Sequence, residues 1–326
     1  MKARPLYVII AALFICVALA SCKKDEERLD MTLTINVHGI TGFCLKGEGT
    51  AIVNWGDGSP NLEKPIEPDR YTSFSYDYSE ENIRTIKIYG NKVTALYCDY
   101  LDIADLDVSK NTALTELDLF RCQLLDLDVC KNLALTILIC WGPEITSLDL
   151  SKNLALKKLW CVFNQLTSLD VSNNLALTDL SCSSNPLWSL DVSKNTTLKN
   201  LSCSDTYITV LDVSKNTALT NLGCTYNRFL TNLDVSKNTA LTLLYCSANQ
   251  LTSLDVTNNT VLCWVACANN IFSTEALDDL FGTLHSNAIQ DKKIYVQDNP
   301  GSETCNSSIA TEKGWIIETR PGTSVI

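Results

Sequence analysis

The feature that most constrains this chain is a Leu-Asp pair that returns every 21 or 22 residues. A second column keeps the same step, with a cysteine in most repeats and Leu119 in the one repeat that lacks it. A fixed interval of about 20–50 residues is the signature of a solenoid, in which each repeat, here called a rung, packs only against its neighbours. The aspartates are Asp107, Asp128, Asp149, Asp170, Asp191, Asp212, Asp234 and Asp255, and the cysteines are Cys98, Cys140, Cys161, Cys182, Cys203, Cys224, Cys246 and Cys267.

One typical rung covers residues 156–171 and reads LKKLWCVFNQLTSLDV, which fits the leucine-rich-repeat pattern L-x-x-L-x-L/C-x-x-N-x-L. Residues 93–272 therefore resemble the short leucine-rich repeats of internalin-like bacterial surface proteins. The resemblance implies a mainly β solenoid of 21-residue rungs. Nine such rungs, with parallel strands about 4.8 Å apart, would make a rod or shallow arc about 40 Å long.

Departures from the pattern mark expected irregularities. The Asn position is filled at Asn164, Asn185, Asn227, Asn249 and Asn270, where the side chain should bind the backbone of the turn that leaves the strand, but becomes Cys122, Pro143 and Thr206 elsewhere. Pro143 predicts an altered loop. The single 22-residue step, at Phe229 and Leu230, predicts a bulge.

The second half of a rung, such as LDVSKN at 211–216, alternates apolar and polar residues and predicts a short extended segment. Stacked aspartates might form a cation ladder. Six rungs, however, carry a lysine three residues after the aspartate, which favours charge compensation, and no rung has the ligand spacing of a calcium loop. No metal site is predicted.

The two flanks are expected to cap the solenoid, whose open ends would expose the core. Residues 31–92 predict a small β-domain. Its stretches 52–58 and 71–76 resemble a polycystic-kidney-disease (PKD) type of immunoglobulin-like sandwich, although the segment is short for seven strands, and Asp57 is read as a turn former. Residues 273–326 predict an α/β cap: a helix over 274–284 ended by His285, a strand at 294–299 with Val296 in the cysteine column, a second helical turn, Gly314 as a stop, and a closing strand.

The N-terminus reads as a targeting segment. Lys2 and Arg4 precede an apolar run over 6–19, which is shorter than the roughly 20 residues of a membrane-spanning helix and predicts a signal peptide over 1–21. The sequence LASC at 19–22 resembles a bacterial lipobox and implies lipidation of Cys22, followed by a linker over 22–30. KKDEE at 23–27 resembles the lipoprotein export signal of Bacteroidota, which implies an outer-membrane anchor and display at the cell exterior; no other membrane contact is expected.

Charge and residue usage argue against several functions. The 326 residues carry a net charge of −11, the wrong sign for binding nucleic acid, and only two histidines, His38 and His285. No catalytic or nucleotide-binding motif is present, so neither enzymatic activity nor a cofactor is predicted. One cysteine per rung offers no C-x-x-C cluster, which favours a column of buried free thiols over disulfides or zinc. Five cysteines outside the column are left undecided: Cys44, Cys122, Cys130, Cys263 and Cys305.

Side chains that flank the inward Leu and Cys should point out of the strand face. Many are aromatic, and Phe120, Trp141, Trp160 and Phe163 are expected to form one continuous surface, whereas the fifth and sixth rungs are polar. Such rings either bind a ligand or stabilise the sheet across strands. By likeness to bacterial leucine-rich-repeat adhesins, the favoured function is binding of a protein or glycan ligand, and the alternative is a structural or scaffold role in an envelope assembly. The candidate ligand residues are Tyr97, Tyr100, Phe120, Trp141, Trp160, Phe163, Tyr245 and Trp264.

Overall fold

The computed structural model describes residues 29–318, apart from residues 38, 91 and 143. The predicted signal peptide over 1–21, Cys22, the predicted linker up to residue 28, and Pro143 of the expected altered loop therefore lie outside the described residues. No helix in the described ranges is long and apolar enough to cross a membrane.

The N-terminal part is a β-sandwich. Its first sheet has the order β4-β3-β6-β1-β8, and its second sheet begins with β5-β2-β7. Strand β1 buries every second residue from Met31 to Val37, and Trp55 lies fully buried beside Phe43 and Tyr76. The strands are β1 (Leu29–Val37), β2 (Ile40–Gly47), β3 (Gly49–Asn54), β4 (Leu62–Ile66), β5 (Thr72–Asp77), β6 (Asn82–Tyr89), β7 (Val93–Asp99) and β8 (Ile103–Asp107).

The turn after β3 confirms the role expected of Asp57. Its carboxylate accepts the backbone N–H of Ser59 at 2.9 Å, and this hydrogen bonding lowers the Asp57 pKa to about 2. Gly56 and Gly58 on either side have positive φ angles of 79° and 85°.

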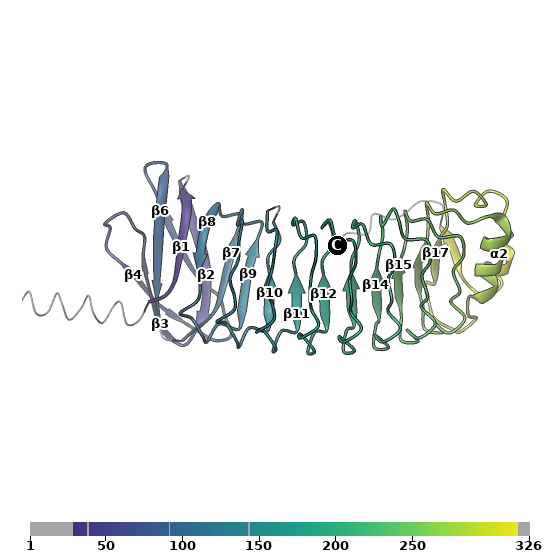
Figure 1. The fold of residues 1–326 in the computed structure, drawn as a ribbon, viewed down its shortest axis with the longest axis horizontal. Helices are drawn as coiled ribbons and strands as arrows, with labels where there is room; N and C mark the ends of the chain where they lie inside the picture. The colour runs from purple at the N-terminus through teal and green to yellow at the C-terminus, as the bar shows by residue number, and fades with distance from the viewer. Residues whose placement is uncertain (1–28, 38, 91, 143, 319–326) are drawn as a thin grey trace, which may run out of the picture.

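The sandwich and the solenoid share one sheet. Strand β7 pairs antiparallel with β2 on one side and parallel with β9 on the other, so the second sheet continues through thirteen strands to β18 (Figure 1). Strand β8, in the first rung, pairs with β1 in the first sheet. The first rung thus completes the sandwich, and the hydrophobic core runs on from residues 31–92 into the rungs.

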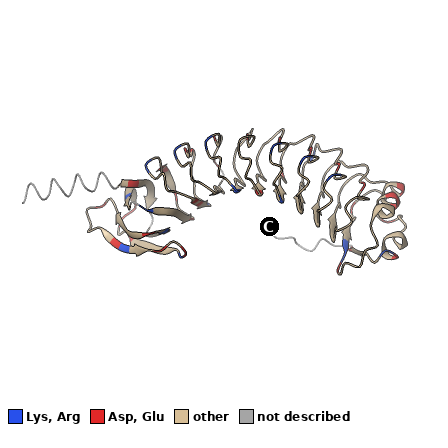
Figure 2. Cartoon of the chain, turned by 90° about the horizontal axis from the view of Figure 1, so that it is seen from below, with Lys and Arg blue, Asp and Glu red and all other residues tan. Residues whose placement is uncertain are grey.

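The solenoid strands are parallel and in register one rung apart, as in the pairs Leu138–Leu159 and Leu180–Leu201. They lie along the inner side of a curved arc (Figure 2). This agrees with the mainly β solenoid of 21-residue rungs expected from the sequence. The strands are β9 (Glu116–Phe120), β10 (Ile137–Ile139), β11 (Lys158–Trp160), β12 (Asp179–Ser181), β13 (Asn200–Ser202), β14 (Asn221–Gly223), β15 (Leu243–Tyr245) and β16 (Trp264–Ala266).

The cysteine column is buried as predicted. Each column cysteine is at most 2% exposed, with its sulfur free, and Leu119 fills the same column in its rung. Burial raises the pKa of these thiols, to about 12 at Cys140 and Cys203, because the low-dielectric core disfavours the thiolate. The column therefore packs as small apolar side chains.

Asparagine side chains hold the turns in two ladders. In the ladder foreseen from the sequence, Nδ2 donates to the carbonyl of a column cysteine one rung back, as from Asn185 to Cys161 at 2.8 Å. Where the asparagine is missing, Cys122 Sγ lies 3.7 Å from the Cys98 carbonyl, and Thr206 donates to Asn227. The other ladder, which the sequence analysis did not single out, uses the Asn of each Lys-Asn step, as from Asn216 to the Val192 and Asn195 carbonyls.

In the first rung the second half begins as an extended segment, since Leu106 and Asp107 belong to β8, but the later rungs differ from their prediction. Residues 211–216 form no strand, and Asp212 accepts the backbone N–H of Ser214 at 2.8 Å in a side-chain turn. The same bond recurs at every aspartate of the column. These hydrogen bonds lower the aspartate pKa first, and lysine only secondarily, as at Asp234. The aspartates are thus turn formers before they are charge partners.

The expected bulge lies at Arg228 and Phe229. They form a turn closed by a hydrogen bond from Leu230 N–H to the Asn227 carbonyl at 2.9 Å. The extra residue is accommodated in the turn, and Leu230 keeps its buried place.

The C-terminal cap consists of α2 (Thr274–Thr283), β17 (Lys293–Tyr295), α3 (Ser308–Thr311) and β18 (Ile316–Glu318). Ser273 caps α2 by accepting the N–H of Ala276, and Val296 lies in the cysteine column as predicted. His285 follows the end of α2, with its Nε2 2.8 Å from the Leu262 carbonyl. Buried Lys292 donates to the carbonyls of Asn287 and Lys313 and so ties the cap loops together.

Candidate ligand-binding surface

Each solenoid strand presents alternate side chains to solvent. In β11, Lys158 and Trp160 flank buried Leu159, and the parallel register aligns these positions from rung to rung. Of the predicted ligand residues, Tyr100 and Phe163 are 62% and 51% exposed, and the other six are half-buried. All eight therefore reach the surface, but they form separate groups.

The largest group lies where the first strands end. Phe120 contacts Tyr100 at 6.1 Å and Trp141 at 4.7 Å between ring centroids, and Trp141 stacks on Phe163 at 5.7 Å with an interplanar angle of 11°. Arg121 joins these rings, with its guanidinium carbon 5.0, 5.3 and 5.9 Å from the ring centroids of Tyr100, Phe120 and Trp141. We call Tyr100, Phe120, Arg121, Trp141 and Phe163 the aromatic edge cluster.

Backbone conformation places three members of the cluster. Tyr100, Arg121 and Phe163 have positive φ angles of 55°, 55° and 57°. The same left-handed residue recurs at this place in later rungs, so it belongs to the turn of the solenoid rather than to a single site. The turn carries these side chains to the edge of the strand face, beside Phe120, the last residue of β9, and Trp141, two residues beyond the end of β10.

A shallow pocket of about 450 Å³ opens beside the cluster, lined by Arg121, Gln123, Trp141, Gly142, Glu144 and Phe163. Gly142 lies so close to the neighbouring rung that a Cβ would be 2.5 Å from the Cys122 carbonyl oxygen. A larger residue there would push the rungs apart and disturb the pocket wall.

Trp160 stands apart from the cluster. We expected Phe120, Trp141, Trp160 and Phe163 to form one continuous surface, but among the described residues no ring contact joins Trp160 to the other three. Lys158 Nζ instead lies 3.6 Å from the Trp160 ring centroid. The reason is position along the rung: Trp160, the last residue of β11, is in register with Ile139, whereas Trp141 lies two residues beyond Ile139 and past the end of β10.

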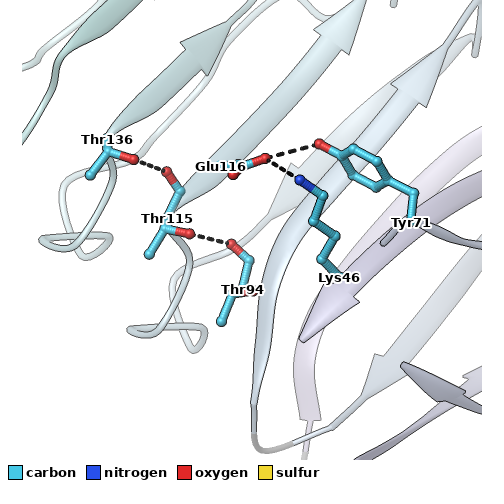
Figure 3. Close-up of polar contacts among 6 residues, drawn as sticks. All are labelled: Lys46, Tyr71, Thr94, Thr115, Glu116 and Thr136. Carbon is cyan, nitrogen blue, oxygen red and sulfur yellow. Dashed lines mark hydrogen bonds and ion pairs between the residues drawn. The ribbon is translucent and has the colours of Figure 1, made fainter. Parts of the chain in front are cut away.

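The strand face next to the N-terminal sandwich is acidic, and hydrogen bonds connect it to that sandwich. Glu116 on β9 accepts hydrogen bonds from Lys46 at 3.1 Å and from Tyr71 at 3.0 Å, while threonine hydroxyls of successive rungs bond to the preceding backbone (Figure 3). Tyr97 lies against Tyr71, with ring centroids 5.8 Å apart. Burial raises the pKa of nearby Asp118 to about 6, and its Oδ1 has no hydrogen-bond partner.

The middle rungs are polar, as the sequence indicates, and their side chains bond to one another. Ser183 and Ser202 hydroxyls are 2.8 Å apart, and Asn200 donates to Asp179 at 2.6 Å. Further along, Tyr245 and Trp264 form a second aromatic group with Tyr295, whose ring centroid is 4.8 Å from that of Trp264.

No group of three or more His, Cys, Asp or Glu side chains in the described part of the chain could hold a metal ion. The aspartate column does not form one, because each carboxylate is engaged with its own turn.

Comparison with known proteins supports the fold. No protein-family model matches the chain, and no curated protein matches it. The functional domain of InlJ from Listeria monocytogenes, which includes a cysteine ladder, is similar in structure, with a TM-score of 0.60 and 35% identity. The match covers 68% of this chain and 47% of that one, so this chain spans about half of the InlJ structure. A leucine-rich-repeat protein of Leptospira interrogans has a TM-score of 0.50 at 19% identity, with 65% and 68% of the two chains covered.

The fold is a leucine-rich-repeat solenoid. The surface of this solenoid also carries residues that the sequence analysis missed. Arg121 was not singled out, because a column alignment does not show which rings surround a side chain. Tyr295 was missed because α2 interrupts the repeat interval before its rung.

A further ring cluster on the leucine-rich repeats also escaped notice. Trp188 lies 5.1 Å from Tyr207 and 5.9 Å from Phe229 between ring centroids, and the three side chains are 57%, 43% and 48% exposed. They occupy different offsets in their rungs, so no column of the repeat brings them together. The conformation of the turns brings the three rings together in the fold.

Proposed function

We propose that this protein is a non-enzymatic binding protein of the cell surface, and that the aromatic edge cluster is its ligand site. The carrying observation is that five Tyr, Phe, Trp and Arg side chains contact one another over four successive rungs at the surface. The solenoid core needs apolar residues only in its inward columns, so it does not account for them. Tyr, Trp and Arg are the residue types that dominate protein-binding hot spots.

A protein ligand fits this cluster better than a glycan. A sugar ring stacks on a free aromatic face, but Trp141 has Phe163 stacked on it at 5.7 Å and Phe120 against it at 4.7 Å. The mutual packing covers part of the ring faces and leaves a shallow pocket, which suits the side chains of a protein partner. The structural similarity to InlJ, whose compared part is described as a functional domain, is consistent with this proposal.

The cell-surface location rests on the sequence alone. We propose that Cys22 carries a lipid anchor in the outer membrane and that residues 23–27 direct export, with a PKD-type sandwich as the membrane-proximal cap. A Cys22→Ala variant that stays in the membrane fraction would contradict the anchor. Intact cells from which added protease removes none of the wild-type protein would contradict the display.

The test of the binding function is an array of extracellular proteins and glycans probed with residues 29–326, which contain both caps and the whole core. We expect saturable binding to a protein when the chain is detached from the cell. Binding only to glycans would contradict the protein-ligand proposal.

A scaffold role in an envelope assembly is the second candidate. The cluster of Trp188, Tyr207 and Phe229 favours it, because a second exposed aromatic group gives the solenoid two separate contact surfaces. Cross-linking in intact cells distinguishes the two: a scaffold is recovered with envelope proteins of its own cell, and the detached chain binds nothing on the array.

A further inference from the structure

Arg121 is a cation held by aromatic rings instead of by an acid. Four other cations pair with carboxylates, as Arg70 does with Glu67 at 2.9 Å and Lys293 with Glu318 at 2.9 Å. Among the residues that the structure describes, no carboxylate lies within 4 Å of the Arg121 guanidinium. In a chain whose net charge is −11, this is an unneutralised positive charge at an exposed position.

The rings hold the guanidinium while leaving donors free. Arg121 Nη1 donates to the Tyr100 hydroxyl, and the faces of Tyr100, Phe120 and Trp141 lie 5.0 to 5.9 Å from the guanidinium carbon. A guanidinium has five N–H donors in a rigid fork that matches a carboxylate with two parallel hydrogen bonds. Ring packing reduces the side-chain entropy that binding would otherwise cost.

The pocket beside Arg121 limits the ligand further. Trp141 and Phe163 form an apolar wall, and Gln123 adds an amide that can donate or accept. Glu144 lines the same pocket and repels any anion there, so the single cation Arg121 can compensate for one carboxylate but not for several. These groups suit one carboxylate next to an apolar group, and they disfavour a polyanion.

We propose that Arg121 binds the carboxylate of an acidic side chain on the protein partner, with an adjacent apolar side chain packed against Trp141 and Phe163. The proposal deepens the proposed function and rests on it for the class of partner. The sequence alignment of the rungs does not single out Arg121 as a ligand residue.

The test uses a small probe, so that it does not depend on finding the partner. Acetyl-Glu-Phe-amide and its neutral counterpart acetyl-Gln-Phe-amide are titrated against residues 29–326 by ligand-observed NMR. We expect the acidic dipeptide to bind about tenfold more tightly, with a preference that weakens as salt is added. Arg121→Gln should remove the preference, and Arg121→Lys should retain only part of it, because lysine lacks the fork.

Matched controls separate binding from folding. Lys158→Gln removes a cation that covers Trp160, outside the cluster, and should keep the full preference. Circular dichroism should be unchanged and the melting temperature should change little in all variants, because Arg121 and Lys158 lose only ring and hydroxyl contacts at the surface and none in the buried core.

Equal binding of the two dipeptides, or a preference that survives Arg121→Gln, would overturn the carboxylate site while leaving an array result for a protein ligand intact. Tighter binding of D-glucuronate than of the acidic dipeptide, lost in Arg121→Gln, would instead assign the site to an acidic sugar and overturn the protein class. An array without any protein ligand, beside a dipeptide preference that does depend on Arg121, would contradict the proposed function alone.

Discussion

At the scale of single residues, the column cysteines act as buried apolar groups. Cys182 is fully buried, and its sulfur is 3.7 Å from the Ser202 carbonyl, so its thiol makes at most a weak hydrogen bond. Sulfur is large and polarisable, and it fills the space between rungs.

Cys182→Ser should therefore lower the free energy of unfolding by roughly 1–3 kcal/mol, because a hydroxyl is buried with poor hydrogen bonding. Cys182→Ala should cost less, since it leaves only a small cavity. Urea unfolding of the two variants measures the difference. A serine variant as stable as the wild type would show that the column is not dry and apolar.

Asp118 is a residue whose charge opposes folding. Its pKa is about 6 in the folded chain against an ordinary value of 3.8, chiefly because it is partly buried. The folded state therefore favours the protonated form. The stability that this provides is fully present below about pH 3.8 and is lost as the pH rises through about 6.

Asp118→Asn should raise the free energy of unfolding at pH 7.5 by about 1–2 kcal/mol, a figure that allows for solvent screening of a half-buried group. Near pH 4 the variant and the wild type should be nearly equal. Denaturant unfolding at both pH values measures this. A stabilisation of the same size at both pH values would mean that the ionised carboxylate is not the cause.

At the scale of elements, the sequence predicts the strands and buried columns that recur in every rung. The 21-residue step aligns buried Leu and Cys, so the strand register and the inward columns follow from it, as at Leu159 and Leu180. The helix over 274–284 follows from apolar spacing, and α2 buries Leu277, Leu280 and Phe281.

Other elements follow from contacts between distant segments and could not be predicted. The pairing of β7 with β2 and of β8 with β1 joins segments about 50 to 70 residues apart. The 21-residue repeat interval does not predict these strand pairs. After the first rung, the segments of the LDVSKN type alternate like strands, yet the Asp side chain accepts a hydrogen bond from the backbone of its own turn, and these described segments form no ladder. In the candidate site, all eight predicted side chains reach the surface, but which rings touch depends on the left-handed turns after the strands.

At the scale of the whole molecule, the chain is a one-dimensional stack closed at both ends. The sandwich covers the first rung through β7 and β8, and the C-terminal cap covers the last full rung through α2, β17 and β18. The core is continuous from one cap to the other. With stability supplied by these inward columns, exposed aromatic rings can be replaced without removing core contacts.

Because the core and the surface rings are separate, binding through the aromatic edge cluster can be tested directly by substitution. The most direct measurement is the affinity of half-buried Trp141→Ala for the protein found on the array, beside Trp188→Ala, which replaces an exposed tryptophan outside the cluster. We expect Trp141→Ala to lose about 2 kcal/mol or more of binding free energy, the scale of a hot spot, with little change for Trp188→Ala and similar melting temperatures for both. Wild-type affinity in Trp141→Ala, or an equal loss in Trp188→Ala, would contradict this expectation.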